Sequence, residues 1–445
     1  MEKIKVLFVS LGCDKNLADT EMMLGILQEK GYSFTDDDAE ADVVVVNTCC
    51  FIGDAKEESI NALLEMAELK KGGRLKVLIA AGCLAQRYRE EIRKEIPEVD
   101  AVVGTAAAEE IAEAVEESLA GKARNHYRDL NDPPASRRDR VLTTGGHFAY
   151  LKIAEGCGKH CTYCIIPKVR GDYRSIPMEK LAEQAQALAE GGVKELILVA
   201  QETTLYGVDL YGKKSLPQLL RRLAQISGIY WIRLLYCYPE EITDELIEVI
   251  AREPKICHYL DIPIQHASDS VLKRMGRRTS QEELRQRIAG IRERIPDICL
   301  RTTLISGFPG ETQEDFEELY RFVNEMEFDR LGVFAYSQEE DTPAAQMPDQ
   351  IETFVKEARR DELMELQQAV AFEKAEEMIG QVLDVMVEGK VADEDVYVTR
   401  TYRDAPNVDG YLFLNTTAML VTGDFVKALV TDFNEYDLIG EIYHE

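Results

Sequence analysis

The sequence has no apolar run long enough to cross a membrane. Its longest runs, such as ADVVVVNTCC at residues 41–50, stop well short of the roughly 20 residues that a spanning helix needs. Proline and glycine are not enriched, at 14 and 29 of 445 residues, so we expect no large disordered region. The first residues, MEKIKVLFVSLGCDKN, predict a strand and lack the apolar segment and cleavage site of a signal peptide. We therefore expect a cytoplasmic protein without a membrane segment.

Basic residues are also scarce relative to acidic ones. The chain carries 52 Lys and Arg against 81 Asp and Glu, a formal net charge of −29. Such a surface repels nucleic acid phosphates unless a local basic patch exists, and it attracts basic proteins at rates that fall with salt. Acidity can also serve solubility alone. The charge therefore disfavours nucleic acid as the primary partner.

The N-terminal part, residues 1–123, alternates short apolar runs with amphipathic stretches. Strands are expected at 5–10, 42–47, 76–81 and 100–104, and helices around 19–30, 55–70, 85–95 and 108–120. Alternation at this spacing predicts a doubly wound parallel sheet. Residues 124–147 are polar, basic and broken by Pro and Gly pairs, which predicts a linker.

Two further domains are expected, since 445 residues correspond to about three domains. Within residues 148–377, candidate strands lie at 148–154, 195–200, 231–236, 259–264, 299–305 and 330–336, each before a helix-like segment. Six βα units predict a partial (β/α)6 barrel, because a complete barrel of this type has eight. A long helical run then ends near Gly380. The alternating pattern of residues 378–445, rich in β-branched and aromatic residues, predicts a small all-β, OB-like barrel.

Three cysteines stand close together after the first expected barrel strand. Cys157, Cys161 and Cys164 form a C-x-x-x-C-x-x-C run at the rim where barrel active sites lie. Three thiolates in one loop suit an iron–sulfur cluster, which normally takes four ligands, so one iron would stay open. Zinc with His160 as a further ligand is the alternative, although structural zinc sites more often use two separated pairs.

A second trio is spread over the N-terminal part. Cys13, Cys49 and Cys83 each follow an expected strand. Because carboxyl ends of parallel strands share one edge, these residues could meet in space, whereas the alternative is scattered buried cysteines. Three others, Cys237, Cys257 and Cys299, lack ligand spacing and are expected in the core.

The run CGKHCTYC resembles the signature of the radical S-adenosylmethionine (SAM) superfamily. The resemblance implies that the open iron binds SAM and that an electron from the cluster cleaves SAM to a 5′-deoxyadenosyl radical. It also implies that SAM or substrate contacts come from loops after the strands: Tyr163, Gln201, Thr203, Gln265, His266 and Gly307. The alternative for each is a loop group that satisfies backbone hydrogen bonds.

Three motifs, LGCDKNLADTE, NTCCFI and AAGCLAQRY, resemble the cysteine motifs of the methylthiotransferase family. The resemblance extends over the whole chain, with a cluster domain at 1–123, a radical-SAM barrel at 148–377 and a C-terminal TRAM domain at 378–445. It implies a second 4Fe–4S cluster on Cys13, Cys49 and Cys83, with Cys50 as a competitor for Cys49, and a role for that cluster in sulfur delivery. It further implies a flavodoxin- or ferredoxin-like electron donor.

Two branches of that family differ in substrate. One modifies the β-carbon of an aspartate in ribosomal protein S12 of the small subunit, and the other modifies an adenosine in tRNA. The N-terminal motifs resemble the first branch, with departures at Asp14 and Cys50. The C-terminal domain carries thirteen Asp and Glu against four Lys and Arg, a net of −9, which suits a basic protein better than RNA.

Three alternatives remain at this point. The linker arginines Arg137, Arg138 and Arg140 are the feature that favours tRNA, unless they belong to a solvated loop. A non-catalytic iron–sulfur carrier would need no barrel of this size. A partner that only binds the ribosome would not need the six cysteines. The default expectation for the oligomeric state is a monomer.

Overall fold

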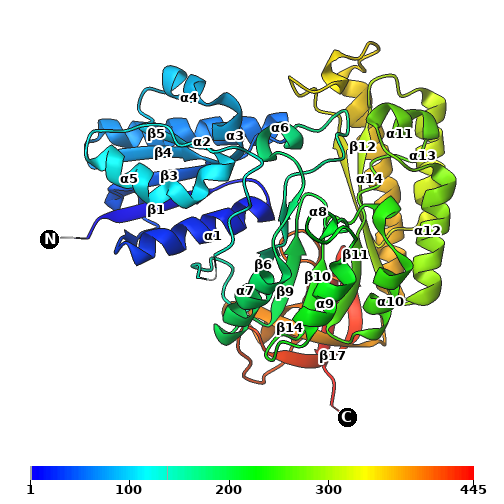
Figure 1. Cartoon of the computed structure of the whole chain (residues 1–445). Coiled ribbons are helices and arrows are strands. Elements are labelled where there is room, and N and C mark those ends of the chain that lie inside the picture. Colours follow the sequence, from blue (N-terminus) through cyan, green and yellow to red (C-terminus); the bar gives the residue numbers. More distant parts are fainter. Residues whose placement is uncertain (1–2, 138, 445) are drawn as a thin grey trace.

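The computed structural model describes residues 3–137 and 139–444. It begins with a five-stranded, all-parallel sheet in the order β2-β1-β3-β4-β5 (Figure 1). The strands are β1 (Lys5–Ser10), β2 (Ser33–Phe34), β3 (Val43–Thr48), β4 (Val77–Ala81) and β5 (Ala101–Val103). The helices are α1 (Asp14–Glu29), α2 (Gly53–Lys71), α3 (Gly82–Tyr88), α4 (Glu90–Glu95) and α5 (Ile111–Leu119), with η1 (Asp38–Glu40) and η2 (Thr105–Glu110) between them.

The central strand β3 explains why this sheet has helices on both faces. Its run of four valines is fully buried, so both of its faces need apolar cover. Val43 and Val45 pack with residues of α1 and α5, while Val44 and Val46 pack with residues of α2, α3 and α4. The doubly wound prediction is confirmed.

The expected helix at 85–95 is wrong as a single element. The structure divides it into α3 and α4, with Arg89 between them at φ 45°, in the left-handed region. A helix cannot continue through a left-handed residue, because its carbonyl and amide groups leave the helical direction.

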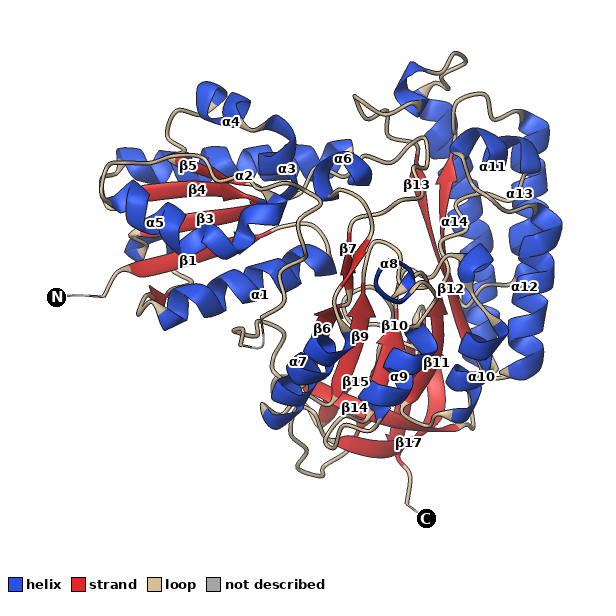
Figure 2. Ribbon diagram, in the orientation of Figure 1, coloured by secondary structure: helices blue, strands red, loops and turns tan. Residues whose placement is uncertain are grey.

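The second domain is a six-stranded parallel sheet in the order β13-β12-β11-β10-β9-β6 (Figure 2). Its strands are β6 (Phe148–Lys152), β9 (Glu195–Val199), β10 (Trp231–Leu234), β11 (Ile256–Asp261), β12 (Cys299–Ser306) and β13 (Arg330–Ala335), and β7 (Ala154–Glu155) pairs with β8 (Arg174–Ser175). β6 and β13 are the two ends of the strand order, which confirms the partial barrel. β11 ends before Pro263, which has no N–H to donate, and not at 264 as expected.

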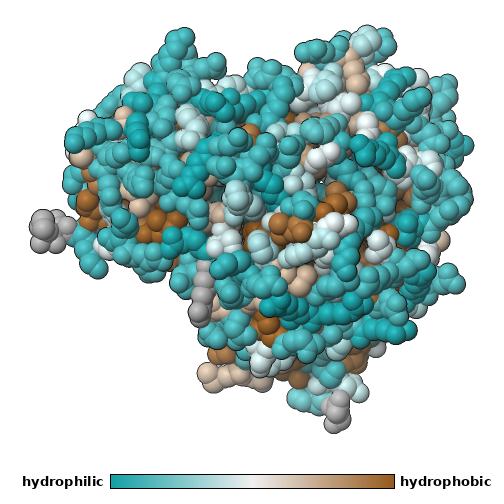
Figure 3. Space-filling view, viewed as in Figure 1, coloured by the Kyte–Doolittle hydropathy of each residue, from teal (hydrophilic) through white to brown (hydrophobic). Residues whose placement is uncertain are grey.

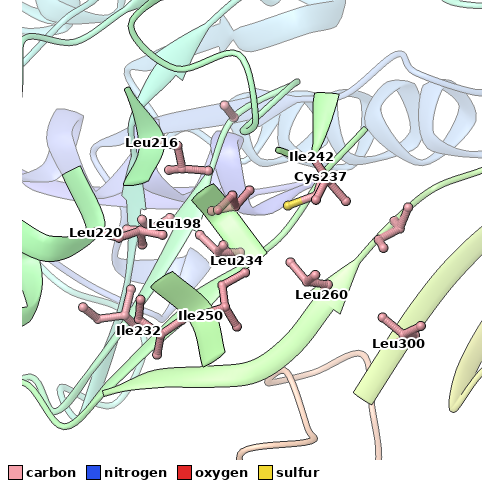
Figure 4. Packing of buried hydrophobic residues seen from close by; sticks show 14 of the residues in the cluster. Leu198, Leu216, Leu220, Ile232, Leu234, Cys237, Ile242, Ile250, Leu260 and Leu300 are labelled. Carbon is pink, nitrogen blue, oxygen red and sulfur yellow. The ribbon is translucent and has the colours of Figure 1, made fainter. Parts of the chain in front are cut away.

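Helices cover the outside of the partial barrel. The helices of this part of the chain are α6 (Ile166–Arg170), α7 (Met178–Glu190), α8 (Val208–Tyr211), α9 (Leu216–Ala224), α10 (Asp244–Arg252), α11 (Asp269–Met275), α12 (Gln281–Arg294), α13 (Gln313–Met326) and α14 (Thr353–Glu376), with η3 (Pro239–Glu241) and η4 (Ala344–Gln346). Of these, α6 packs against α3 of the N-terminal domain and not on the outside of the barrel. Leucine and isoleucine side chains fill the space between strands and helices (Figure 4), and Cys237 lies among them. Cys257 and Cys299 are buried in a second apolar cluster, so the core prediction for all three cysteines is confirmed.

The C-terminal domain is a closed five-stranded barrel. Its strands are β14 (Val382–Lys390), β15 (Val396–Thr401), β16 (Leu412–Asn415), β17 (Phe425–Asn434) and β18 (Asp437–Ile442). It packs against the amino-terminal end of the larger barrel, where Phe425 meets the ring of Trp231 edge-on at 4.8 Å. Glu195, the first residue of β9, accepts from Arg233 at 2.7 Å and from Arg400 of β15 at 2.7 Å. The opposite end of the larger barrel, where the strands have their carboxyl ends, is not covered by this domain and can hold a functional site.

The segment between α5 and β6 contains no helix or named strand in its described residues. It is held to its neighbours: Arg137 contacts Glu29 at 2.7 Å, and Arg140 is buried beside Glu21 and donates to the Tyr150 carbonyl at 2.6 Å. Arg138 lies outside the described residues. The arginines that favoured RNA therefore do not form an open patch in the described part of the segment, while the domain boundaries stay a prediction.

Polar residues cover most of the face in Figure 3, with apolar residues in separate small patches. None of the helices in the described part of the chain combines the length and apolar character that a membrane span requires.

Candidate functional site

The cysteine loop of the larger barrel follows β6 and β7 at the carboxyl end of the sheet, as expected. The Cys157 amide donates to the carbonyl of Gly171 at 3.1 Å, and the Cys164 amide donates to the carbonyl of Cys161 at 3.0 Å. Burial raises the pKa of the Cys157 thiol to about 11 and also raises the pKa of Cys164. Iron binding at this loop must therefore displace thiol protons.

His160 is not placed as a ligand for zinc at the cysteine loop. The residue is exposed and has a φ of 52°, while Cys157 and Cys161 on either side are buried. Within the described ranges, it belongs to no group of three ligand side chains close enough to share one ion. This geometry gives no support to zinc with His160 as a ligand.

The second cysteine trio is assembled at the carboxyl edge of the N-terminal sheet. Cys13 precedes α1, Cys49 follows β3 and Cys83 lies in the first turn of α3, after β4. A Cβ on Gly12 would lie 2.9 Å from the Cys49 Sγ, so only glycine fits between Cys13 and Cys49. The loops are also joined by Asn16, whose amide donates to the carbonyl oxygens of Leu11 and Thr48 at 2.9 Å each.

Cys49 and Cys50 face different surroundings. Burial raises the pKa of Cys49, and Cys13 and Arg170 are among the neighbouring residues that influence this pKa. Burial raises the pKa of Cys50 to about 11, with Arg87 as the main opposing influence. Cys49 thus faces the trio and the barrel. The assignment of Cys49, and not Cys50, as the cluster ligand stays a prediction, because both thiols lie close enough to Cys83 to raise its pKa.

Arg170 connects the two cysteine trios. It ends α6, six residues after Cys164, and is 2% exposed. Its Nε donates to the Cys83 sulfur at 3.3 Å, and its Nη1 donates to Asp19 at 2.7 Å and to Glu155 at 3.2 Å. A guanidinium from the barrel therefore reaches a proposed ligand of the N-terminal cluster.

Glu155 and Lys152 complete the polar network at the barrel mouth. Lys152 bonds to Asp19 and, at 2.7 Å, to Glu155, and Gln201 donates to Glu155 at 2.9 Å. Although burial acts to raise it, Lys152 and Arg170 hold the pKa of the Glu155 carboxyl below its usual range. The sequence analysis missed these residues, although Lys152 and Glu155 end the strands that lead into the cysteine loop.

Six residues were predicted as SAM or substrate contacts, and all lie in the cysteine loop or after barrel strands. Gln201 has a buried Oε1 without a partner among the described residues, which leaves it free to accept from a ligand. Thr203 is fully buried, and its hydroxyl donates to the Leu235 carbonyl at 2.5 Å, which is the backbone role named as the alternative. Tyr163 meets Phe308 edge-on at 6.4 Å, which brings it near Gly307.

Gly307 and Gln265 both have left-handed backbones. Gly307 has φ 70°, and a Cβ there would lie 2.3 Å from a Lys356 side-chain carbon of α14, so the position requires glycine. Gln265 has φ 69° and forms an isolated bridge with Leu304. Strained loop residues cluster at ligand sites, but the contacts of these residues with SAM stay predictions.

His266 and Glu202 are buried near these loops. His266 Nδ1 accepts from the Ser268 amide at 3.0 Å, and its Nε2 lies 3.5 Å from Glu311. Burial raises the pKa of Glu202 to about 7, and its Oε2 has no hydrogen-bond partner among the described residues. Glu202 also contributes to the raised pKa of Cys157. It is therefore a further group of the site, and the sequence did not predict it.

A separate group could hold a single ion by distance. Ligand atoms of Glu110, Glu113 and His126 lie within 4.8 Å of one another, and in the described part of the chain neither cysteine trio meets that limit. Tetrahedral zinc thiolates lie roughly 3.8 Å apart, given a zinc–sulfur bond of about 2.3 Å. The trios are thus spread more widely than one zinc ion requires. The carboxylate of Glu110 is already paired with Arg128 at 2.5 Å.

Comparisons with known proteins agree with this geometry. Residues 5–104 match the model described as "Uncharacterized protein family UPF0004", residues 151–323 match the radical SAM superfamily, and residues 379–442 match the TRAM domain. The radical SAM methyltransferase TsrM from Kitasatospora setae shares the fold, with TM-score 0.54 at 13% identity over 95% of this chain and 84% of that one. OxsB, a cobalamin-dependent SAM radical enzyme, has TM-score 0.51 at 13% identity over 84% of this chain and 56% of that one. Fold and cysteine loop together define a radical SAM enzyme.

Curated relatives give the particular family. The ribosomal protein uS12 methylthiotransferase RimO of Lachnoclostridium phytofermentans is 62% identical over 98% of this chain and 99% of its own length. The enzymes of that name from Clostridioides difficile and Trichlorobacter lovleyi are 49% and 50% identical over 99% and 100% of this chain, and each is covered to 99%. The chain belongs to the RimO family of radical SAM methylthiotransferases.

Proposed function

We propose that this chain replaces a hydrogen on the β-carbon of an aspartate in ribosomal protein uS12 with a methylthio group. The observation that carries the proposal is the approach of the two cysteine trios, since Arg170 from the barrel loop contacts Cys83 of the N-terminal sheet at 3.3 Å. Two sites so close can divide one reaction between radical generation and sulfur transfer. The relatives described above are named ribosomal protein uS12 methylthiotransferases.

Each cysteine trio would hold one 4Fe–4S cluster. Cys157, Cys161 and Cys164 would bind the cluster of the barrel, and Cys13, Cys49 and Cys83 the cluster of the N-terminal domain. When bound, the clusters supply the electron that cleaves SAM and the iron that presents sulfur. A trio leaves one iron without a protein ligand in each case, and the donor sets are soft thiolates, which suit iron–sulfur clusters.

The chain's own residues prepare the mouth for SAM. Gln201 offers a buried free carbonyl oxygen, Glu202 a buried free carboxylate oxygen and Tyr163 an aromatic surface. Gln265 and Gly307 add backbone groups after β11 and β12. Thr203 would act by holding the loop after β9 in place through its bond to Leu235. The first turn of α1, where Asp14 accepts from the Tyr236 hydroxyl at 3.2 Å, would help to exclude water from the radical.

The charge of the TRAM domain supports the protein substrate over tRNA. All four of its Lys and Arg have acidic partners: Arg400 pairs with Glu195, Arg403 with Asp329, Lys390 with Asp395 and Lys427 with Asp384. Both arginines are turned into the interface with the barrel. An RNA-binding barrel needs free cations for phosphates, whereas an acidic surface complements a basic ribosomal protein.

Mass spectrometry of two parallel reactions tests the proposal. Reduced, cluster-loaded protein is incubated with SAM, sulfide and either uS12 or tRNA. We expect uS12 to gain one methylthio group in place of hydrogen and tRNA to stay unchanged. The opposite result would assign the tRNA branch, and SAM cleavage without either product would reject both. We further propose a monomer that works beside ribosomes in the cytoplasm with a flavodoxin- or ferredoxin-like electron donor.

A further inference from the structure

Lys15 is a buried cation that has no anionic partner among the residues that the structure describes. The residue lies in the first turn of α1, two positions after Cys13, and is 6% exposed. Its ammonium sits 3.2 Å from the ring centroid of Tyr236, and this is the one contact of its side chain recorded in the described part of the protein. No described carboxylate oxygen lies within 4.0 Å of it.

The other buried lysines show that this arrangement is unusual. Lys159 pairs with Glu240 and Glu241, and Lys356 donates to the Tyr336 carbonyl at 3.1 Å. The described residues offer Lys15 neither a carboxylate nor a carbonyl oxygen as a partner. Burying an ammonium without a counter-charge is costly, and a cation–π contact with one tyrosine offsets only part of that cost.

The two carboxylates that bond to Tyr236, the ring under Lys15, are Asp14 and Asp261. Asp14 accepts from the Tyr236 hydroxyl at 3.2 Å. Asp261 accepts from the Tyr236 amide at 3.0 Å and from Arg301 at 3.1 Å. The chain thus holds both acids away from the ammonium, which stays available for an anion from outside.

The location of Lys15 identifies that anion. Tyr236 follows β10 in the middle of the sheet, has φ 60°, and its carbonyl accepts from the Thr203 amide at 3.0 Å, so the ammonium lies over the barrel mouth. The backbone of Lys15 belongs to the loop of Cys13. An anion bound there would lie between the sites of the two proposed clusters.

We propose that Lys15 binds the side-chain carboxylate of the target aspartate and so determines the choice of substrate. The inference rests on the proposed function. The carboxylate carbon of aspartate is bonded directly to the β-carbon. An ion pair between Lys15 and this carboxylate therefore restricts the position of the reacting carbon. Such positioning serves a reaction in which the hydrogen must be removed from one carbon only.

A cycle of enzyme and substrate variants tests this inference. Wild-type protein and the Lys15→Met variant are each given uS12 and uS12 with the target Asp changed to Asn. Fluorescence anisotropy measures Kd, and mass spectrometry measures kcat/KM. We expect Lys15→Met to lower kcat/KM for the Asp substrate by about tenfold or more and to leave the Asn substrate nearly unchanged, because the two changes remove the same ion pair. Equal losses for both substrates, or none, would overturn the inference.

Three further measurements exclude a merely structural role. Lys15→Arg keeps the charge and should keep the preference for Asp. Lys194→Met removes another lysine–tyrosine contact, in which the ammonium lies 5.3 Å from the centroid of the Tyr230 ring. This variant should leave kcat/KM unchanged for both substrates. SAM cleavage without uS12 should be the same in Lys15→Met as in wild type, whereas a parallel loss would show that Lys15 serves the SAM carboxylate.

The outcomes also separate this inference from the proposed function. A wild-type protein that modifies uS12 while Lys15→Met keeps the full Asp preference refutes the role of Lys15 alone. A wild-type protein that never modifies uS12 refutes the proposed function and with it this inference.

Discussion

The two cysteine trios reach their sites by different routes. Cys157, Cys161 and Cys164 lie within eight residues of one loop, and backbone bonds within that loop and to Gly171 hold them. The other trio comes from three strand ends, and only the parallel sheet brings it to one edge. The barrel site is therefore a local structure, whereas the N-terminal site depends on its whole domain. Four predictions test this difference, from the largest expected effect to the smallest.

Removing a thiol from the barrel loop should abolish radical generation. In Cys161→Ala we expect 5′-deoxyadenosine formation to fall to background and the iron content to drop from about eight to about four per chain, because one 4Fe–4S cluster is lost. Iron analysis and chromatography of the SAM products measure both. Cys237→Ala, in the core cluster, is the matched control and should retain all the iron. Full iron in Cys161→Ala would refute the ligand assignment.

Removing a thiol from the N-terminal edge should separate the two half-reactions. In Cys83→Ala we expect about four irons per chain, continued formation of 5′-deoxyadenosine and no methylthio product, because only the sulfur site is lost. The Cys50→Ala variant serves as the comparison for the neighbouring Cys49 and should keep both clusters. If Cys50→Ala lost the N-terminal cluster and Cys49→Ala kept it, the assignment of this ligand would pass to Cys50.

Arg170 should influence the N-terminal cluster more than its own loop. In Arg170→Met we expect a lower reduction potential for the N-terminal cluster, because a hydrogen bond and a positive charge at the Cys83 sulfur are lost. Breaking the buried pair with Asp19 should also cost about 3 kcal/mol of stability. Redox titration followed by electron paramagnetic resonance, in a Cys161→Ala background, isolates that cluster.

Arg170→Lys provides the control, since it keeps the charge and loses the forked geometry. Compared with Arg170→Met, the Arg170→Lys variant should restore part of the lost reduction potential and a smaller part of the lost stability. An unchanged potential in Arg170→Met would show that the contact with Cys83 is only structural.

The last prediction concerns stability alone and involves Glu202 and pH. Burial raises its pKa from 4.5 to about 7, so the folded chain binds this proton more tightly than the unfolded chain. The resulting stability is fully present below pH 4.5 and is lost as the pH rises through about 7, a change of about 3 kcal/mol. Thermal melting of metal-free protein should therefore show that Glu202→Gln gains stability over wild type between pH 5 and pH 8.

The exposed Glu293→Gln is the control for that measurement and should show no such gain. A constant difference between Glu202→Gln and wild type across this range would contradict a buried carboxyl that titrates near neutral pH.

Local patterns predicted the fold and most of the candidate site. The alternation of short apolar runs with amphipathic stretches predicted the doubly wound parallel sheet that contains β3, and the spacing of Cys157, Cys161 and Cys164 predicted a cluster loop at the end of β6. The rule that parallel strands end at one edge was enough to bring Cys13 and Cys49 together. These features could be predicted because period, spacing and strand direction are properties of short segments.

Only the tertiary structure decided which side chains meet across domains. The contact of Arg170 with Cys83 spans 87 positions and that of Tyr236 with Asp14 spans 222, so no local sequence pattern predicts either contact. The same holds for the TRAM arginines, which turn to Glu195 and Asp329 and away from solvent. A side chain finds its charge partner only after packing has placed both. The sequence therefore determined which ligands each site could have, and packing decided what surrounds them.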